Sequence, residues 1–164
     1  MYRRQLLFTA IISTLPVRAI AKENNLSDQV HENAALAVRQ FQDRAKGRLD
    51  YSASSLSEIE DMLDEAARHA TDLKAETIET LIELIGCYIL EVGFRENGGK
   101  FAWYAERKQP VLIVGEPAFH VALITFDKVR GRLSGDKADN IPFFYQGFSE
   151  RVKAAVPGTK ALYV

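Results

Sequence analysis

The pattern of apolar and polar positions is strongest between Glu76 and Trp103 (ETIETLIELIGCYILEVGFRENGGKFAW). Apolar residues from Ile78 to Phe94 occupy every side of a helical wheel, and a helix that is apolar all round is normally buried. Asn97-Gly98-Gly99 predicts the end of this helix, and an aromatic strand follows. An acidic residue, Glu91, interrupts the last part of the apolar run. We therefore expect a buried helix with one enclosed carboxylate at the centre of the fold.

Two further helices are predicted before this one. Apolar positions recur at helical spacing between Asp28 and Lys46, and Gly47 is a natural stop. Ser55-Leu56-Ser57-Glu58 has the form of a capping box that opens a second helix. Asp72 is the expected N-cap of the central helix.

After the central helix the pattern changes to short runs typical of strands. These runs are Phe101–Glu106, Val111–Val114 and Phe119–Ile124, with turn signals between them and a break at Gln109-Pro110. Such spacing predicts an antiparallel meander. The last residues, Lys160–Val164, are expected to form either an extra edge strand or a loose tail.

Helical spacing returns between Asp127 and Leu133, and Pro142 suits the first turn of a last helix. The order of helices, strands and helices predicts the α+β class. We expect three N-terminal helices, a three- to four-stranded antiparallel meander and one or two C-terminal helices, in a single domain over residues 22–164. Gly86 and Gly93 lie seven residues apart, so they either let another backbone approach the central helix or are simply tolerated in it.

Residues 1–21 resemble a cleavable export signal. A positive start, Met1 to Arg4, precedes a modestly apolar stretch from Leu6 to Val17 and a small-x-small pattern at Ala19-Ile20-Ala21. The apolar stretch is about half of the ~20 residues that a membrane-spanning helix requires. A signal of the general secretory or the twin-arginine type predicts a periplasmic protein that begins near Lys22. The alternative is an ordinary first helix of a cytosolic protein.

Net charge, hydropathy and cysteine content limit the kinds of binding partner and cross-link that are expected. Removal of residues 1–21 takes away three arginines and shifts the net charge from −1 to −4. Nucleic-acid-binding domains are usually strongly basic, so no nucleic-acid partner is expected. No second apolar run is long enough to insert the mature chain in a membrane. The lone Cys87 has no partner for an internal disulfide and is expected to be a buried core residue.

The sequence lacks the common catalytic and cofactor patterns. There is no G-x-S-x-G elbow, H-E-x-x-H helix, phosphate-binding loop or G-x-G-x-x-G fingerprint. The three histidines are far apart, which does not indicate a metal site. We expect His31 and His69 on solvated helix faces and His120 on a strand, where it could face inward. The prediction is therefore no catalytic residue, no metal and no cofactor.

Glu91 is the first candidate for a functional residue. A buried carboxylate needs a partner, because an unpaired buried charge either shifts its pKa or destabilises the fold by several kcal/mol. Arg95, four residues on, is the local partner, and Lys128, Arg130, Arg132 or a strand residue near Trp103 could supply a tertiary one. Glu91 is therefore expected to form a structural ion pair or, as the alternative, to face a ligand.

Three further features are candidate interaction sites. Lys128-Val129-Arg130-Gly131-Arg132 is a basic cluster that is either a solvated helix face or a docking point for an acidic partner. The acidic run Glu58–Glu65 is either an exposed helix face or a docking point for a basic partner. Trp103 becomes an interface anchor if it is exposed. The candidate binding residues are Glu91, Trp103, Lys128, Arg130 and Arg132.

Four short motifs carry a resemblance. They are Ser55-Leu56-x-x-Ile59-x-x-Met62-Leu63, Ile85-Gly86-Cys87-Tyr88-Ile89-Leu90-Glu91-Val92, Gly98-Gly99-x-x-x-Trp103 and Phe126-x-Lys128-Val129-x-x-Arg132-Leu133-x-Gly135. Together they resemble a widespread bacterial family, a domain of unknown function, over about Ser55 to Arg151. The resemblance marks Gly86, Glu91, Trp103, Lys128, Arg132 and Gly135. Some members are similar to proteins encoded beside polymorphic-toxin and type VI secretion genes, where small proteins often act as immunity factors.

These observations predict a periplasmic, non-enzymatic binding protein with a protein partner. The resemblance implies an immunity protein that occludes a type VI toxin through an acidic or aromatic patch. One alternative is an envelope enzyme or small-ligand-binding domain that uses Glu91 with Trp103 and Lys128 or Arg132. Another is an accessory envelope domain without a discrete site.

Overall fold

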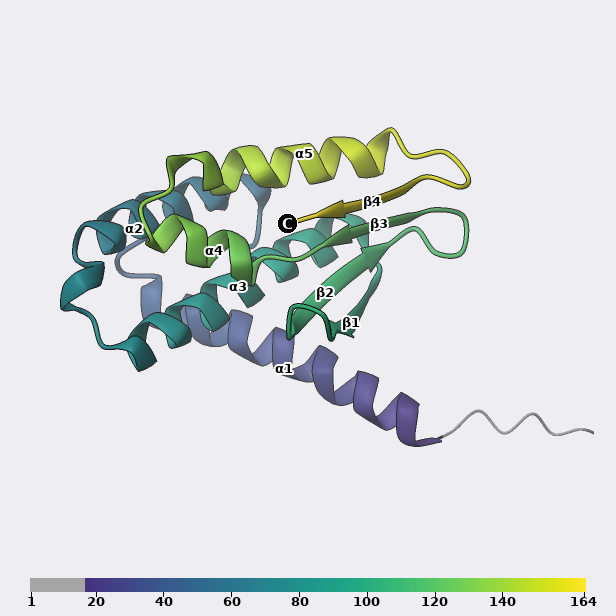
Figure 1. Cartoon of the computed structure of the whole chain (residues 1–164), viewed down its shortest axis with the longest axis horizontal. Coiled ribbons are helices and arrows are strands. Elements are labelled where there is room, and N and C mark those ends of the chain that lie inside the picture. The colour runs from purple at the N-terminus through teal and green to yellow at the C-terminus, as the bar shows by residue number, and fades with distance from the viewer. Residues whose placement is uncertain (1–16) are drawn as a thin grey trace, which may run out of the picture.

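The computed structural model describes the backbone of residues 17–164 and the side chains of residues 25–164. Residues 1–16, which include most of the predicted export signal, lie outside the described residues. The described part is an α+β fold, as predicted, with helices first, then a strand meander, then helices and a last strand (Figure 1). Its elements are α1 (Val17–Phe41), α2 (Leu56–Arg68), α3 (Ala75–Asn97), β1 (Lys100–Tyr104), β2 (Gln109–Val114), β3 (His120–Leu123), α4 (Phe126–Leu133), α5 (Ile141–Lys153) and β4 (Lys160–Tyr163).

The four strands form one sheet in the order β1-β2-β3-β4. The pairs β1–β2 and β2–β3 are antiparallel, as predicted for the meander. Strand β4 is the edge strand that was one of two expectations for the C-terminus, but it runs parallel to β3. The prediction of a purely antiparallel sheet is therefore wrong for this pair. Parallel neighbours need a long crossover, and α4 and α5 supply it between β3 and β4.

One row of residues across the sheet carries most of the helix packing. Phe101, Leu112, Leu123 and Tyr163 are register partners from β1 to β4 and share the inner face. Helix α1 places the ring of His31 edge-on to Phe101 at 5.5 Å, and α5 places Phe148 against Tyr163 at 6.1 Å. Helix α3 passes over the two central members of the row. Helices α1, α3 and α5 therefore cover the inner face (Figure 1).

Helix α3 is the buried element that its sequence predicts. Nearly every residue from Ile82 to Gly93 is buried in it, and Gly98 (φ +67°) and Gly99 (φ +107°) end it in a left-handed turn, as expected. The close approaches at its two internal glycines come from side chains rather than from another backbone. A Cβ atom on Gly86 would lie 2.4 Å from the ring of Phe126, and one on Gly93 would lie 2.9 Å from Leu112.

Two predicted helix caps are wrong. The hydroxyl oxygen of Ser55 accepts no capping bond from the first turn of α2. This hydroxyl instead donates to the carbonyl of Ser52 and lies 2.7 Å from the Tyr88 hydroxyl on α3. The oxygen of Ser52 instead accepts from the backbone N–H of Ser55 and caps the short turn before α2. Asp72 ends another short turn, and α3 begins after Lys74.

Element boundaries also differ from the expected ones. Helix α1 begins at Val17, passes through the predicted cleavage point without a break and ends at Phe41. Turns occupy the residues from there to Gly47, which has a φ of +77°. Strand β2 begins at Gln109 and includes Pro110, which was expected to break it. Proline is tolerated here because it stands near the start of the strand.

Candidate functional site

Glu91 is enclosed and held by two partners. Its side chain on α3 is only 6% exposed, and its Oε1 accepts a hydrogen bond of 2.6 Å from Nε of Arg95. Its Oε2 lies 2.5 Å from Nδ1 of His31 on α1, and because a carboxylate only accepts, this nitrogen carries the proton. The predicted pair with Arg95 is therefore confirmed. His31, expected on a solvated helix face, has a side chain that is 37% exposed, and its Nδ1 faces Glu91.

Aromatic rings surround this group. The ring of His31 lies edge-on to Phe94 at 5.3 Å as well as to Phe101, and the guanidinium of Arg95 stands 3.8 Å from the centre of the Tyr51 ring. Cation–π contacts of this kind strengthen with desolvation. The cluster thus joins α1, α3, β1 and the loop before α2. Both carboxylate oxygens of Glu91 take part in joining these segments.

The predicted tertiary pair between Glu91 and the basic cluster of α4 is wrong. Arg132 is 4% exposed and donates hydrogen bonds of 2.6 Å to both Glu60 and Asp64 on α2. Desolvation lowers the pKa of Arg132, but its hydrogen bonds to the two carboxylates outweigh burial and raise that pKa. The same contact holds the pKa of Asp64 below its usual value. Glu60 also accepts the backbone N–H of Ile141 at 2.9 Å, so this group fastens α4 to α2 and α5.

Lys128 and Arg130 are paired within the chain as well. Lys128 is largely buried, 2.8 Å from Asp139 and 4.9 Å from the centre of the Phe144 ring. Arg130 is about half exposed and bonds Glu79 of α3 at 2.9 Å. Only Arg130 thus fits the expectation of a solvated face, and Lys128 and Arg132 stabilise the packing of α4.

The acidic residues of α2 also form ion pairs within the chain. Besides Glu60 and Asp64, Glu58 lies 3.0 Å from Arg48 and Glu65 lies 2.5 Å from Arg44. The hydrogen bond from Arg44 lowers the pKa of Glu65. Most of this run is therefore engaged by arginines of the same chain.

The outer face of the sheet, opposite the inner row, is apolar. Val111, Ala122 and Ile124 form a small buried cluster there, and the apolar side chains that pack on it all come from β1 and β2. Ile113, Ala122 and Leu162 are register partners across β2, β3 and β4. Among residues 25–164, the strands and the adjoining Ile124 therefore build this surface, which we call the outer sheet face. It forms an open groove of about 490 Å³ lined by Ala102, Trp103, Tyr104, Val111, Ile113, His120, Ala122, Lys160, Ala161 and Leu162.

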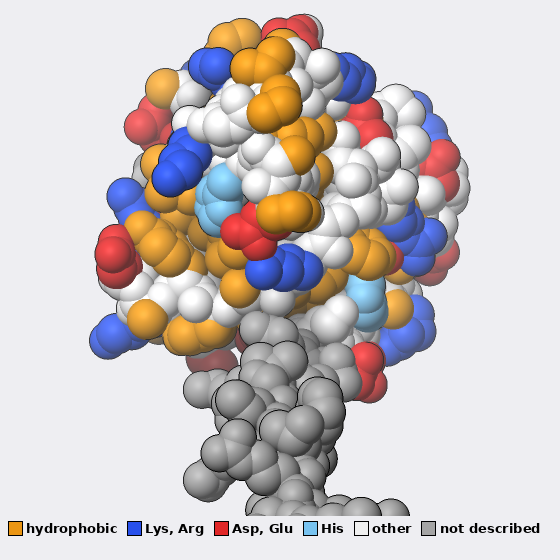
Figure 2. All heavy atoms as spheres, turned by 90° about the vertical axis from the view of Figure 1, so that its right-hand side faces the viewer, with side chains coloured by type: hydrophobic (Ala, Val, Ile, Leu, Met, Phe, Trp, Pro, Cys, Tyr) orange, Lys and Arg blue, Asp and Glu red, His pale blue; other side chains and the backbone are white. Residues whose placement is uncertain are grey.

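Two large apolar side chains of this groove are open to solvent. Trp103 on the edge strand β1 is 52% exposed, and Leu162 on β4 is 46% exposed. His120 lies on a strand, as expected, and it lines the outer groove and bonds Glu116 at 2.8 Å. The hydrogen bond from Lys100 is the largest cause that lowers the pKa of Glu116. Figure 2 looks onto the loop end of the sheet, where hydrophobic side chains gather between acidic and basic ones.

Sequence reasoning missed His31 and the outer sheet face. The partner of His31 lies 60 residues away along the chain, so no local spacing signals the pair. The outer face did leave a signal, because Val111–Val114 is apolar at every position. A strand of that kind is apolar on both faces of the sheet.

Other reactive groups are enclosed or dispersed. Burial raises the pKa of the Cys87 thiol to about 12, which fits the expected core role. Within residues 25–164, no three His, Cys, Asp or Glu side chains come close enough together to hold a metal ion. The described helices include none that is long and apolar enough to cross a membrane.

Known proteins add no further constraint. Comparisons of the chain with protein-family models, with curated proteins and with solved structures found no match. The family resemblance carried by the short motifs therefore stays a prediction, and a functional proposal depends on the surfaces of this chain.

Proposed function

We propose that the chain is a periplasmic, non-enzymatic protein-binding domain that acts as an immunity protein against a type VI toxin. The outer sheet face carries the binding part of this proposal. Grouped exposed apolar side chains mark interaction sites, and tryptophan is enriched among the residues that dominate binding energy. Trp103 meets both descriptions and Leu162 meets the first, because each is about half exposed and both line the same groove.

The size of the outer sheet face indicates how a toxin would have to dock. Four strands about 4.8 Å apart and about five residues long give an area of roughly 250 Å². A stable complex buries about 800 Å² on each partner. The partner must therefore also cover the polar rim, which includes Tyr104, His120 and Lys160. Apolar anchors would give affinity, and the rim would give specificity.

The sequence motifs favour the same surface. Of the residues that the family resemblance marks, Glu91, Lys128 and Arg132 form internal ion pairs. Gly86 lies beneath the ring of Phe126. Trp103 has no such structural task and is exposed, which is the arrangement expected of an interface anchor. The export signal predicted at residues 1–21 supports a periplasmic toxin as the target.

An envelope enzyme or ligand-binding domain that uses Glu91 has less support. A substrate would have to displace Arg95 or His31 from a carboxylate whose two oxygens are both engaged. Lys128 and Arg132 would not assist, because they lie in other ion pairs with Asp139, Glu60 and Asp64. The enzyme or ligand-binding alternative therefore lacks a site where a free carboxylate and a free basic side chain lie together.

The test is binding between the purified chain and the product of the neighbouring toxin or secretion gene. We expect nanomolar affinity by calorimetry and protection of cells that express the toxin in the periplasm. Leu162→Glu should weaken binding at least about 30-fold, because it places an unpaired charge in the interface. Trp103→Ala should weaken it about 10- to 100-fold through lost apolar contact.

Phe143→Ala is the matched control. Phe143 is 76% exposed on α5 and does not line the outer groove, so its loss should change affinity less than about threefold. Circular dichroism should show that all three variants are folded. The proposal fails if no neighbouring gene product binds, or if the three variants bind equally well.

A further inference from the structure

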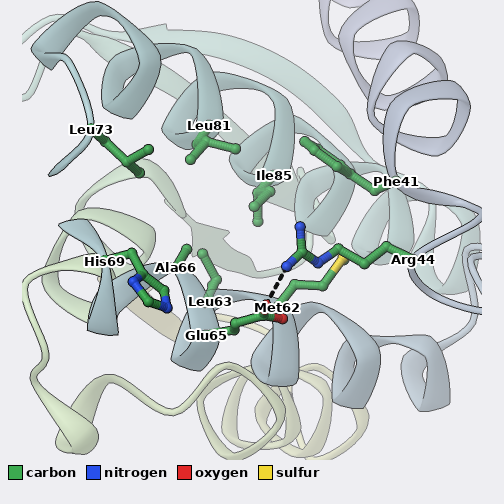
Figure 3. Close-up of a pocket in the computed structure, with 10 residues that line it drawn as sticks. All are labelled: Phe41, Arg44, Met62, Leu63, Glu65, Ala66, His69, Leu73, Leu81 and Ile85. Carbon is green, nitrogen blue, oxygen red and sulfur yellow. Dashed lines mark hydrogen bonds and ion pairs between the residues drawn. The ribbon is translucent and has the colours of Figure 1, made fainter.

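A second concave site lies among the helices, far from the outer sheet face in the fold. It is a cavity of about 230 Å³ between the end of α1, the middle of α2 and the first half of α3. Figure 3 shows apolar side chains from the three segments pointing toward one another across it. Its walls include Phe41, Met62, Ala66, Leu73, Leu81 and Ile85.

The size of the cavity sets the size of a ligand. A cavity of about 150 Å³ lined by Leu, Ile and Phe stays dry and binds benzene. The present cavity is larger and has the same kind of wall, so it accommodates a phenyl ring with a short side arm or a short alkyl chain. Burial of such a group from water supplies the main part of the affinity.

The polar side chains stand at the margin of the cavity. Arg44, in the turns after α1, reaches past Met62 to Glu65 on α2, and His69 lies beyond Ala66 toward Leu73 (Figure 3). The Arg44 and Glu65 side chains are 58% and 50% exposed and meet at 2.5 Å. A ligand seated on the apolar walls would therefore place its polar end beside this ion pair.

The ion pair favours an anionic polar end. A guanidinium has five N–H donors, and the bond from Arg44 to Glu65 uses one of them. A second carboxylate can therefore bind Arg44 without breaking that pair, and such charge-assisted bonds are strong. A cation would meet the positive charge of Arg44 and would have to compete for Glu65, whose carboxylate Arg44 already engages.

We propose that this cavity binds a small carboxylate with an apolar body, of the aryl or short-chain alkyl class. The walls between α1, α2 and α3 hold the apolar body, and Arg44 holds the carboxylate. His69 offers a further donor at the margin. This site is independent of the proposed docking surface, because it shares no residue with the outer groove.

Methionine methyl signals provide a local test on the full chain. The sequence has two methionines, Met1 and Met62, and Met62 lines the cavity. Titration with 3-phenylpropionate should shift the Met62 methyl signal by ring current, with a dissociation constant of about 0.1 to 1 mM for a ligand of this size. The cationic analogue 3-phenylpropylamine should bind at least about 10-fold more weakly, because it meets Arg44.

Variants separate the two parts of the site. Ala66→Phe should fill the cavity and weaken the binding of 3-phenylpropionate at least about 10-fold. Arg44→Gln should reduce the preference for carboxylate over amine to less than about threefold. Arg48→Gln is the matched control, because Arg48 is equally exposed and paired to Glu58 but does not line the cavity.

Several outcomes would overturn the proposal. They are the absence of a saturable Met62 shift, equal binding of amine and carboxylate, and an effect of Arg48→Gln as large as that of Arg44→Gln. If Ala66→Phe does not fold, the comparison of the two arginine variants still decides. Toxin binding is measured separately, so failure of one proposal is distinguishable from failure of the other.

Discussion

Glu91 joins two helices through a carboxylate that is almost fully enclosed. Glu91→Gln keeps the shape of the side chain but removes its charge and one of its two acceptor oxygens. We expect the free energy of unfolding to fall by about 2 kcal/mol, because Arg95 and His31 lose a charged acceptor. Urea denaturation followed by circular dichroism measures this change.

A matched variant distinguishes burial from charge alone. Glu79→Gln also removes a glutamate of α3 that is paired to an arginine, Arg130, but its side chain is 63% exposed. Exposed pairs contribute little, so its cost should stay below about 0.5 kcal/mol. Equal costs for the two variants would contradict a structural role for Glu91 and return it to the candidate ligand-binding residues.

The sequence predicted half of the contacts of Glu91. Arg95 follows from helical geometry, because residues four apart share a face. His31 does not, because its position depends on how α1 crosses α3 and on the rings of Phe94 and Phe101 beside it. One of the three basic residues of α4 was the alternative to Arg95 as the partner of Glu91. The partners of these basic residues are set instead by the packing of α4 against α2 and α3.

At the scale of elements, Gly86 sets how closely α4 approaches α3. A Cβ atom there would lie 2.4 Å from the Phe126 ring and 3.3 Å from Oγ1 of Thr125, which donates to the carbonyl of Gly86 at 2.8 Å. Gly86→Ala gains roughly 1 kcal/mol of helix propensity. We expect a net loss of about 1 to 2 kcal/mol in unfolding free energy, because overpacking at this contact outweighs the gain.

The same contact offers its own control. Phe126→Leu removes part of the ring that the new methyl group meets, so Gly86→Ala should cost less in that background than in the native chain. A double-mutant cycle by urea denaturation measures this coupling. Additive effects of the two substitutions would show that the ring does not limit the approach of α3 and α4.

The course of the sheet shows where prediction from local pattern ends. The runs that became β1, β2 and β3 alternate with turn signals, and their antiparallel order follows from short connections. Strand β4 has no such neighbour in sequence. The direction of β4 depends on the path of α4 and α5, and long-range packing determines that path. The predicted cap at Ser55 is wrong for a similar reason, since the Ser55 hydroxyl meets Tyr88 from another helix.

At the scale of the whole molecule, the two faces of the sheet have different environments. Helices α1, α3 and α5 pack on the inner face, whereas within residues 25–164 the outer cluster consists of strand side chains and the adjoining Ile124. Strand β2 is nevertheless apolar on both sides. Strands of that composition are typical of sheets with both faces covered. This mismatch supports a partner that supplies the missing layer over the outer sheet face.

The balance of charges across the molecule also predicts how stability depends on pH. Burial raises the pKa of Glu96, but hydrogen bonds from Tyr145 and Ser149 outweigh it and hold that pKa below the ordinary value of 4.5. Asp64, Glu65 and Glu116 also have lowered pKa values, through bonds from Arg132, Arg44 and Lys100. The unfolded chain therefore binds protons at higher pH than the folded chain. Stability from these groups is fully present above the ordinary values and is lost as the pH falls below about 4.5.

Urea midpoints measured between pH 7 and pH 3 test this expectation. The midpoint should be nearly constant down to about pH 5 and should then fall steadily with acid. Glu96→Gln removes one contributing group, so its acid loss should be shallower than that of the native chain. Glu76→Gln, on an exposed position of the same helix, should leave the profile unchanged. A midpoint that rises on acidification would mean that the folded chain binds the extra protons, and these carboxylates would then not stabilise the fold.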